Sequence, residues 1–256
     1  MTGAGLPAVQ LDRVCWGPCG DEGILSGISF SVPQGQVMAI CGAEGAGKSA
    51  LLRLILRQQA PRQGTVRLMG RDIWLMDGSE VARGLAAVVQ DQPRDFALTV
   101  RQVVALGRLP HRRRWGTGLS TPDEEDARVV GAALRRLDLT AMAERPFGAL
   151  SGAARQRVMV ARALAQEPRV IVLDGSANPL GIRRQLDLLA RLKGSGVTVI
   201  AALHARTLAA GLADRVLVLS GRRILSDAPP GAALTRTSLP SVEDPVRSTT
   251  GLRLRR

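Results

Sequence analysis

The chain has 256 residues and a hydrophobic fraction of 45%, which excludes disorder as its default state and allows one domain with a sizeable core. Aromatic residues are very scarce, so we expect a core of Val, Leu, Ile and Ala, which suits an α/β protein with a parallel sheet. The net charge is +13, and 33 of the 35 basic residues are Arg; this reflects either compositional bias or attraction to polyanions.

The N-terminal third of the chain is predicted to be rich in strands. An alternating segment is followed by a turn at 33–35 and then by a continuous apolar strand. The glycine-rich stretch 42–47 ends that strand, and a helix with apolar spacing follows at Lys48–Leu56. Strands are predicted at Gly27–Val32, Gln36–Cys41, Thr65–Met69 and Leu85–Val89.

The middle of the chain, from about 98 to 150, is predicted to be helical and charged. The pattern Thr121–Glu124 resembles a capping box and predicts a helix start. Arg112–Arg114 is interpreted as a solvated run or as a surface near a membrane partner, and His111 as structural or solvent-facing. Beyond this region, strands alternate with helical segments, which predicts a parallel sheet covered by helices. These later strands are predicted at Val170–Leu173, Val197–Ala201 and Val216–Leu219.

The segment Gly42–Ser49 fits the pattern G-x-x-x-x-G-K-[ST] between a predicted strand and a predicted helix. Its glycines allow successive backbone N–H groups to point at phosphate oxygens, and the helix N-terminus adds partial positive charge. Lys48 is expected to reach the β- and γ-phosphates and Ser49 to bind Mg²⁺, so the sequence predicts binding of ATP with Mg²⁺. The predicted nucleotide-binding residues here are Gly42, Ala43, Glu44, Gly45, Ala46, Gly47, Lys48, Ser49 and Ala50.

A phosphate loop of this kind needs an acidic residue on a neighbouring strand to hold the metal ion. Asp174 follows the apolar run Val170–Leu173, where that residue is expected. A strand-terminal turn residue is the alternative interpretation. Together with the loop, Asp174 is predicted to be a metal ligand.

Four other features resemble the ATP-binding subunits of ABC transporters. The segment Leu150–Arg157, 17 residues ahead of Asp174, is similar to the family signature L-S-G-G-Q/E-x-Q-R. Gln90 matches the Q-loop glutamine, His204 the switch histidine, and Trp16 the aromatic residue that stacks on adenine. Without the resemblance, Gln90 would be a surface glutamine, His204 a satisfied histidine at a strand end, and Trp16 a half-buried strand residue.

The resemblance implies catalytic roles for His204 and Gln90, and a metal contact for Gln90. It also implies that Ser151 and Gly152 of the signature contact the nucleotide held by a second ATP-binding subunit. The expected fold is a P-loop NTPase of the ABC type, with a mixed or parallel sheet core, an N-terminal antiparallel β part and an inserted helical subdomain. The expected divisions are core at about 8–97 and 158–228, insert at about 98–157, and a peripheral tail at 229–256.

A finer resemblance comes from the strings Thr99–His111 and Arg145–Pro146, which are similar to ATPases of iron–siderophore, haem and cobalamin importers. The implied partners are transmembrane permease subunits and a second ATP-binding subunit, in a homodimer or a heterodimer. No apolar run is long enough to cross a bilayer, so we expect a cytoplasmic protein held at the inner face of the membrane by its partner.

Several catalytic positions depart from the family pattern. The glutamate that orients the attacking water is replaced by Gly175, whose hydrogen side chain has no acid–base capacity. The D-loop aspartate is replaced by Gly181, and Ala205 follows the switch histidine. The signature carries Ala153 and Ala154, and Ala50 replaces the usual Thr after Ser49. These changes spare the residues expected to bind Mg·ATP and remove those expected to activate water.

Three functions therefore stay open: an importer ATPase, an ATP-binding subunit with little turnover, and an ABC-type protein acting on nucleic acid. The net charge is the only feature that favours the third, because aromatic platforms for bases are missing from the composition, so no nucleic-acid partner is expected. Cys15, Cys19 and Cys41 are too few and too irregularly spaced for a zinc site or a disulfide framework, and Cys41 is expected in the core.

Overall fold

The computed structural model describes residues 5–17, 23–88, 97–112, 114–115, 118–119, 123–174, 182–203 and 211–233. Its larger sheet has six strands in the order β12-β11-β3-β10-β9-β6, all parallel except the antiparallel edge strand β12. The strands are β3 (Val37–Gly42), β6 (Leu85–Val88), β9 (Val170–Asp174), β10 (Thr198–Ala202), β11 (Arg215–Ser220) and β12 (Arg223–Ala228).

The apolar residues of β3 explain why this sheet lies at the centre of the molecule. Successive side chains of a strand point to opposite faces. Val37, Ala39 and Cys41 enter one hydrophobic cluster, while Met38 and Ile40 enter another on the opposite face. Because both faces are covered, the strand is a continuous apolar run rather than an alternating one.

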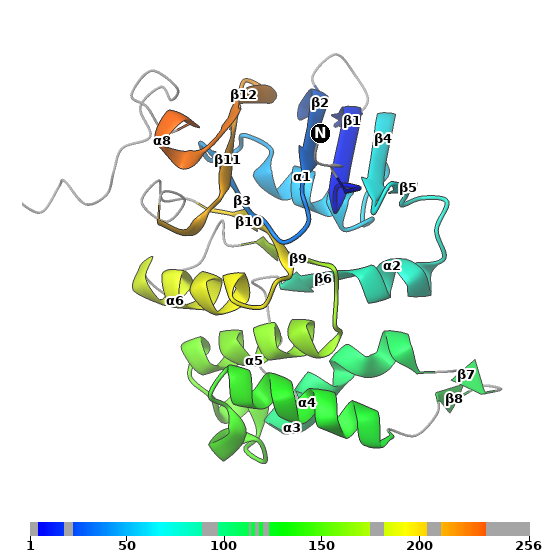
Figure 1. Cartoon of the computed structure of the whole chain (residues 1–256), viewed down its shortest axis with the longest axis vertical. Helices are drawn as coiled ribbons and strands as arrows, with labels where there is room; N and C mark the ends of the chain where they lie inside the picture. Colours follow the sequence, from blue (N-terminus) through cyan, green and yellow to red (C-terminus); the bar gives the residue numbers. More distant parts are fainter. Residues whose placement is uncertain are drawn as a thin grey trace, which may run out of the picture.

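A four-stranded antiparallel sheet and helix α1 cover one face of the central sheet. Figure 1 shows α1 beside this smaller sheet, in the upper part of the view. Leu51, Leu52 and Leu54 of α1 are buried against the central sheet and the smaller sheet. These elements are β1 (Val9–Trp16), β2 (Leu25–Val32), α1 (Lys48–Ile55), β4 (Gln63–Leu68), β5 (Arg71–Asp72) and α2 (Gly78–Gly84).

Helices pack on the other face, with α3, α4 and α5 forming the lower half of the molecule in Figure 1. The helical elements are α3 (Val100–Ala105), η1 (Leu106–His111), α4 (Glu124–Arg136), η2 (Thr140–Met142), η3 (Phe147–Ala149), α5 (Gly152–Ala165), α6 (Ile182–Lys193) and α8 (Pro230–Ala233). A hairpin of β7 (Arg114–Trp115) and β8 (Gly118–Leu119) precedes α4.

This architecture confirms the predicted antiparallel part, mixed sheet and helical insert. The predicted strands are found with ends shifted by a few residues. The helix predicted to start at Thr121–Glu124 is found as α4, but its cap is Asp123, whose carboxylate accepts from Asp126 N at 2.8 Å, so the helix begins two residues later than a cap at position 121 implies. A full capping box instead starts α3, between Thr99 and Gln102. The expected boundary at 157/158 falls inside α5, which packs on both α4 and β6.

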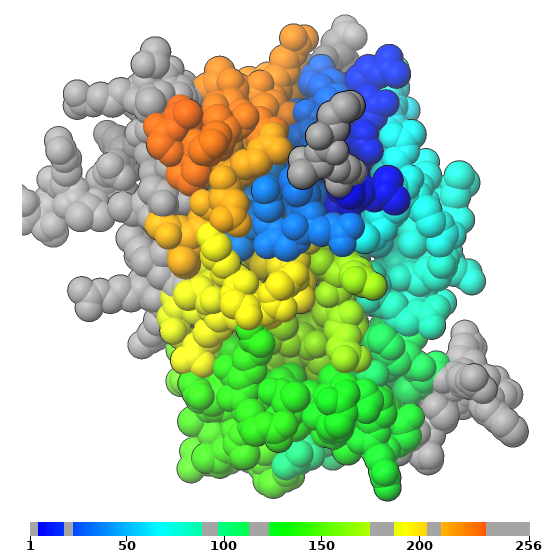
Figure 2. Space-filling view, viewed as in Figure 1, coloured from blue at the N-terminus to red at the C-terminus, as the bar shows by residue number. Residues whose placement is uncertain are grey.

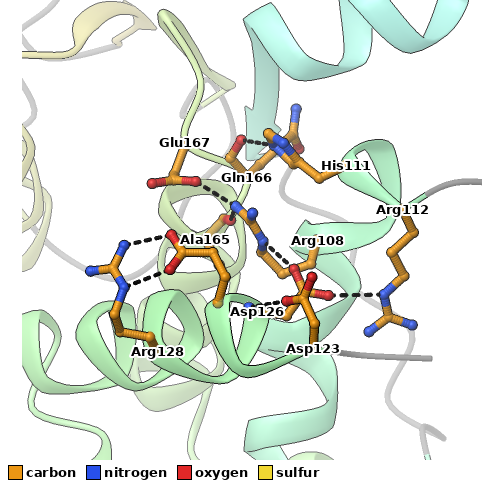
Figure 3. Close-up of polar contacts among 10 residues, drawn as sticks. Arg108, His111, Arg112, Asp123, Asp126, Arg128, Ala165, Gln166 and Glu167 are labelled. Carbon is orange, nitrogen blue, oxygen red and sulfur yellow. Dashed lines mark hydrogen bonds and ion pairs between the residues drawn. The ribbon is translucent and has the colours of Figure 1, made fainter. Parts of the chain in front are cut away.

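Buried polar contacts fasten the insert to the core, and we call Arg108, His111, Asp126, Gln166 and Glu167 the seam cluster (Figure 3). The Arg108 side chain is 5% exposed; it donates to Asp126 at 2.8 Å and to Glu167 at 2.6 Å. His111 Nε2 lies 2.8 Å from the Gln166 carbonyl oxygen. The Gln166 amide donates to carbonyls at the end of α2 and the start of β6. His111 is thus structural, as expected.

Burial disfavours the charged form of Asp126, but hydrogen bonds and positive charge from Arg108 and Arg112 hold the pKa of this carboxyl below its ordinary value. Arg112 is 15% exposed and lies 3.3 Å from Asp126, so the expectation of a fully solvated run at Arg112–Arg114 is wrong for its first residue. The other two residues have no described side chains. Within the described ranges, no helix is both long and apolar enough to span a bilayer.

Candidate functional site

The loop after β3 has a backbone path that glycine makes possible. Gly42, Gly45 and Gly47 have φ angles of +154°, +75° and +94°, which side-chain-bearing residues rarely adopt. A Cβ on Gly42 would lie 2.5 Å from the Leu219 carbonyl oxygen, and one on Gly47 would lie 2.8 Å from Leu25 Cδ2. The loop that joins β3 to α1 is therefore narrow, and a residue with a side chain would clash at either of these two positions.

Helix α1 starts at this loop without a side-chain cap, because its N-cap residue is Gly47. The first N–H groups of a helix have no intrahelical acceptor, and the helix dipole adds positive potential there. Ala43, Glu44 and Gly45 are exposed. This helix start therefore offers backbone N–H groups to an anion, beside the charge of Lys48.

Lys48 opens α1 and is only 4% exposed. Its Nζ donates to the carbonyl oxygens of Gly42 at 2.9 Å and Ala43 at 2.8 Å. Burial lowers the pKa of the Lys48 ammonium, and the electrostatic influence of Cys41, Glu44 and Asp174 opposes that shift. The loop thus holds a partly desolvated positive charge beside its own backbone.

Asp174 ends β9 at the same edge of the sheet as the loop. It aligns with Ala202 of β10, which in turn aligns with Ile40 of β3, two residues before Gly42. The effect of Asp174 on the pKa of Lys48 agrees with this placement. Carboxyl ends of parallel strands are the usual ligand site of open α/β sheets. A hydroxyl at Ser49, a carboxylate and a lysine at a helix start are a donor set that fits Mg²⁺ with a polyphosphate.

Trp16 ends β1, pairs with Leu25 of β2, and packs against the same hydrophobic cluster as Ala46 of the loop. It also lines a cavity of about 510 Å³ together with Leu25, the residue that Gly47 approaches. The two interpretations of Trp16 are therefore compatible, because one part of the ring is packed and another borders an open space. Three arginines, Arg62, Arg222 and Arg223, line the same cavity.

The signature segment lies at the start of α5, in a different layer from α1 (Figure 1). Ser151 is the N-cap of α5: its Oγ accepts from Ala154 N at 3.3 Å. Ser151 and Gly152 are exposed, whereas Ala154 is 4% exposed and belongs to the core of the insert. The two exposed residues at the start of α5, Ser151 and Gly152, thus both match the signature pattern, whereas the departure at Ala154 is buried.

Several sequence-predicted site residues lie outside the described residues: Gln90, Gly175, Gly181, His204 and Ala205. Among those described, the structure brings Lys48 and Asp174 together at one sheet edge, with Trp16 and Leu25 beside the loop. Arg62, Arg222 and Arg223 were missed by sequence reasoning. Arg62 is separated from Arg222 and Arg223 by 160 residues of chain, so no local pattern could have revealed their common cavity.

Comparison with known proteins agrees with this geometry. The family model described as ABC transporter matches residues 25–178. The hemin import ATP-binding protein HmuV of Pseudomonas putida is 38% identical over 231 residues, covering 87% of this chain and 88% of that protein. The achromobactin transport ATP-binding protein CbrD of Dickeya dadantii is 36% identical, covering 86% of this chain and 81% of that protein.

Among solved structures, cbiO1 of Clostridium perfringens, part of the ABC transporter complex cbiONQ, superimposes with a TM-score of 0.78. The alignment covers 91% of this chain and 92% of that protein at 23% identity, which supports the fold alone.

Proposed function

The chain belongs to the ABC transporter family, and on that premise we propose that it is the ATP-binding subunit of an importer for haem, a ferric siderophore or a related metal chelate. The observation that supports it most directly is the glycine-built loop with buried Lys48, at one sheet edge with Asp174. The substrate class rests on the relatives, which include a hemin import protein and an achromobactin transport protein. Selectivity itself belongs to the membrane partner.

In this proposal the loop 42–50 binds the phosphates, Lys48 neutralises their charge, and Trp16 packs on the base. Ser49, Gln90 and Asp174 hold Mg²⁺, which supplies charge neutralisation between the phosphates when bound. Burial has already removed part of the water around Lys48, so little further solvent has to be removed when it meets a phosphate oxygen. His204 is proposed to contact the terminal phosphate.

Two copies of the site face each other in the proposed assembly. Each site combines the phosphate loop of one subunit with the signature of another. Ser151 and Gly152 are exposed at a helix start, so they are accessible to a nucleotide held by another subunit, which supports this arrangement. The second subunit is either another copy or a related chain, and membrane permease subunits attach the pair to the membrane.

We further propose that ATP binding is retained while hydrolysis is slow. Gly175 takes the place of the glutamate that orients water, and loss of one positioned general base commonly costs about 10²- to 10⁴-fold in rate. Positioning by Lys48, Ser49 and Asp174 is unaffected by that change. An ATP-binding subunit that stabilises or regulates the transporter without useful turnover is the alternative role for the same site.

Nucleotide binding and turnover separate these roles. We expect the purified protein to bind ATP in a Mg²⁺-dependent manner, to lose that binding in Lys48→Ala, and to show slow single-turnover hydrolysis. Gly175→Glu should raise the single-turnover rate without tightening ATP binding. Hydrolysis of several ATP per second by the unmodified protein, abolished in Lys48→Ala, would contradict slow turnover. Absence of ATP binding would contradict the proposed function as a whole.

The import role is tested in cells. Deletion of the gene should reduce uptake of one of three labelled substrates: haem, a ferric siderophore or cobalamin. The unmodified gene should restore that uptake, and the Lys48→Ala gene should not. Unchanged uptake of all three substrates would rule out the proposed substrate class while leaving ATP binding untouched.

A further inference from the structure

A second cavity lies between the insert and the core, lined by residues remote from the phosphate loop. It has a volume of about 610 Å³. One wall is the α4 stripe Arg128, Ala132 and Arg136, spaced four residues apart and therefore on one side of the helix. The other walls are core segments: 167–169 before β9, 195–198 at the start of β10, and 34–35 before β3.

The position of this cavity is opposite to that of the phosphate loop. The core segments that line it precede β3, β9 and β10, whereas the loop and Asp174 follow β3 and β9. On the face shown in Figure 2, the green surface of the insert borders the yellow and yellow-green surface of the core. A ligand in this cavity would therefore touch the insert and the core at the same time, without reaching the phosphate loop.

The charge in the cavity is predominantly positive. Arg128, Arg136 and Arg169 line it, and Glu167 is its one acidic residue. Glu167 is already paired with the buried Arg108 of the seam cluster at 2.6 Å (Figure 3). Glu167 therefore offsets only part of the positive charge of the three arginines that line the cavity.

Not all three arginines are equally available. Arg128 is committed to Glu125 through two hydrogen bonds of 2.8 and 2.6 Å. Arg136 donates one bond of 3.2 Å to the Arg191 carbonyl, which leaves most of its five N–H donors. Arg169 is exposed and makes no side-chain hydrogen bond or ion pair within the described part of the chain. Arg136 and Arg169 are therefore the two that can bind a ligand.

The floor of the cavity leaves room for such a ligand. It includes the turns at Gly35 and Gly196, whose backbones approach closely and have no side chains to fill the space. The Gly35 N–H donates to Thr198 Oγ1 at 2.9 Å, which fixes the two turns together. The volume falls within the range of small-molecule pockets and is too small for a folded partner.

We propose that this cavity binds a small phosphate-bearing molecule, with Arg136 of the insert and Arg169 of the core as its main ligands. Guanidinium groups form paired hydrogen bonds with phosphate oxygens, which favours phosphate over a single carboxylate. The two arginines come from separate parts of the fold and line opposite walls of the same cavity. This site is independent of the proposed ATP-binding function, because none of its lining residues belongs to the phosphate loop.

The test uses the full chain with Lys48→Ala, so that binding at the phosphate loop does not obscure the second site. Isothermal titration with tripolyphosphate should show one site per chain. Adding Arg136→Gln and Arg169→Gln should weaken binding by about ten-fold or more. The matched control adds Arg53→Gln and Arg83→Gln, which removes the same charge from exposed positions outside the cavity. Circular dichroism verifies that both variants fold.

Titrations with pyrophosphate and with ADP show whether the cavity binds inorganic phosphates or a nucleotide. A titration with citrate tests whether it prefers phosphates to carboxylates. Tighter binding of either phosphate compound than of citrate supports the proposal. Equal weakening of binding by the cavity pair of substitutions and by the control pair would show non-specific attraction to a basic protein and would overturn the proposal. Binding of citrate as tightly as tripolyphosphate, or no binding by the Lys48→Ala chain, would overturn it as well.

Discussion

The phosphate loop and the seam cluster both place a buried cation next to polar groups, but they are assembled in different ways. The loop is one continuous stretch in which Lys48 meets carbonyls five and six residues away. The seam cluster joins Arg108 to Asp126 and Glu167, which are 18 and 59 residues away. The loop is built mainly from backbone, and the cluster mainly from side chains.

From this difference we infer that the loop serves ligand binding and that the cluster serves stability. The loop exposes backbone N–H groups and keeps its lysine partly desolvated, so its groups are arranged for a ligand. The cluster satisfies its charges within the protein and joins η1, α4 and the end of α5. We therefore expect changes in the cluster to alter the free energy of unfolding and changes in the loop to alter ligand binding.

The largest effect on stability is expected for Arg108→Met. It leaves the Asp126 carboxylate, 8% exposed, with only the longer contact to Arg112, and breaking a buried ion pair typically costs about 3–5 kcal/mol. Urea denaturation measures the change. The matched control is Arg71→Met, which removes an exposed pair with Glu80 and should cost about 0–1 kcal/mol. Equal destabilisation by both would show that the cluster contributes no more than a surface pair.

The next largest changes in stability are expected at two glycines of the insert, where substitution by Ala should destabilise in one case and stabilise in the other. A Cβ on Gly107 would lie 2.2 Å from the Arg162 carbonyl oxygen, so Gly107→Ala should destabilise by about 1–3 kcal/mol. In α4, a Cβ on Gly131 meets only the end of the Arg135 side chain at 3.4 Å, so Gly131→Ala should stabilise by about 0.5–1 kcal/mol. Thermal unfolding of the two variants distinguishes them, and a shared sign would refute the steric argument.

A smaller change in stability is expected when the pH is lowered into the acidic range where Asp126 titrates. Because the pKa of Asp126 is lowered in the folded protein, its contribution to stability is complete above the ordinary value of 3.8. Below that value the unfolded chain binds the proton first, so the contribution is lost as the pH falls toward the folded pKa. Asp126→Asn should therefore show a shallower loss of stability than the unmodified protein in this acidic range. If the free energy of unfolding fell equally with pH in Asp126→Asn and in the unmodified protein, a lowered pKa of Asp126 would be contradicted.

The smallest effect on stability, and the largest on binding, is expected for Lys48→Ala. Its two hydrogen bonds are lost but a desolvated charge is removed, so the free energy of unfolding should change by about 1 kcal/mol or less. Saturating Mg·ATP at about 100 times its Kd stabilises a binding protein by about 2.7 kcal/mol. This stabilisation should appear in the unmodified protein and in Arg71→Met, and vanish in Lys48→Ala. Its persistence would contradict the proposed role of the lysine.

Much of the fold was predictable because its signals are local. The apolar runs of β3 and β9 and the glycine pattern of the loop each lie within a few consecutive residues. The start of α4 was misplaced because Thr121 and Asp123 both fit a cap, and the choice depends on which carboxylate or hydroxyl reaches the first-turn N–H groups. The roles of Gln90 and His204 stay predictions, since these residues lie outside the described ranges.

The amino-acid sequence was sufficient to predict the phosphate loop, the position of Asp174 at a strand end and the family. In each case the determining residues are neighbours along the chain. The packed fold was needed to show that Arg108, Asp126 and Glu167 form one cluster, and that Arg136 and Arg169 line one cavity. These arrangements arise when the insert packs on the core, and no periodicity or spacing in the chain records which charged side chains that packing brings together.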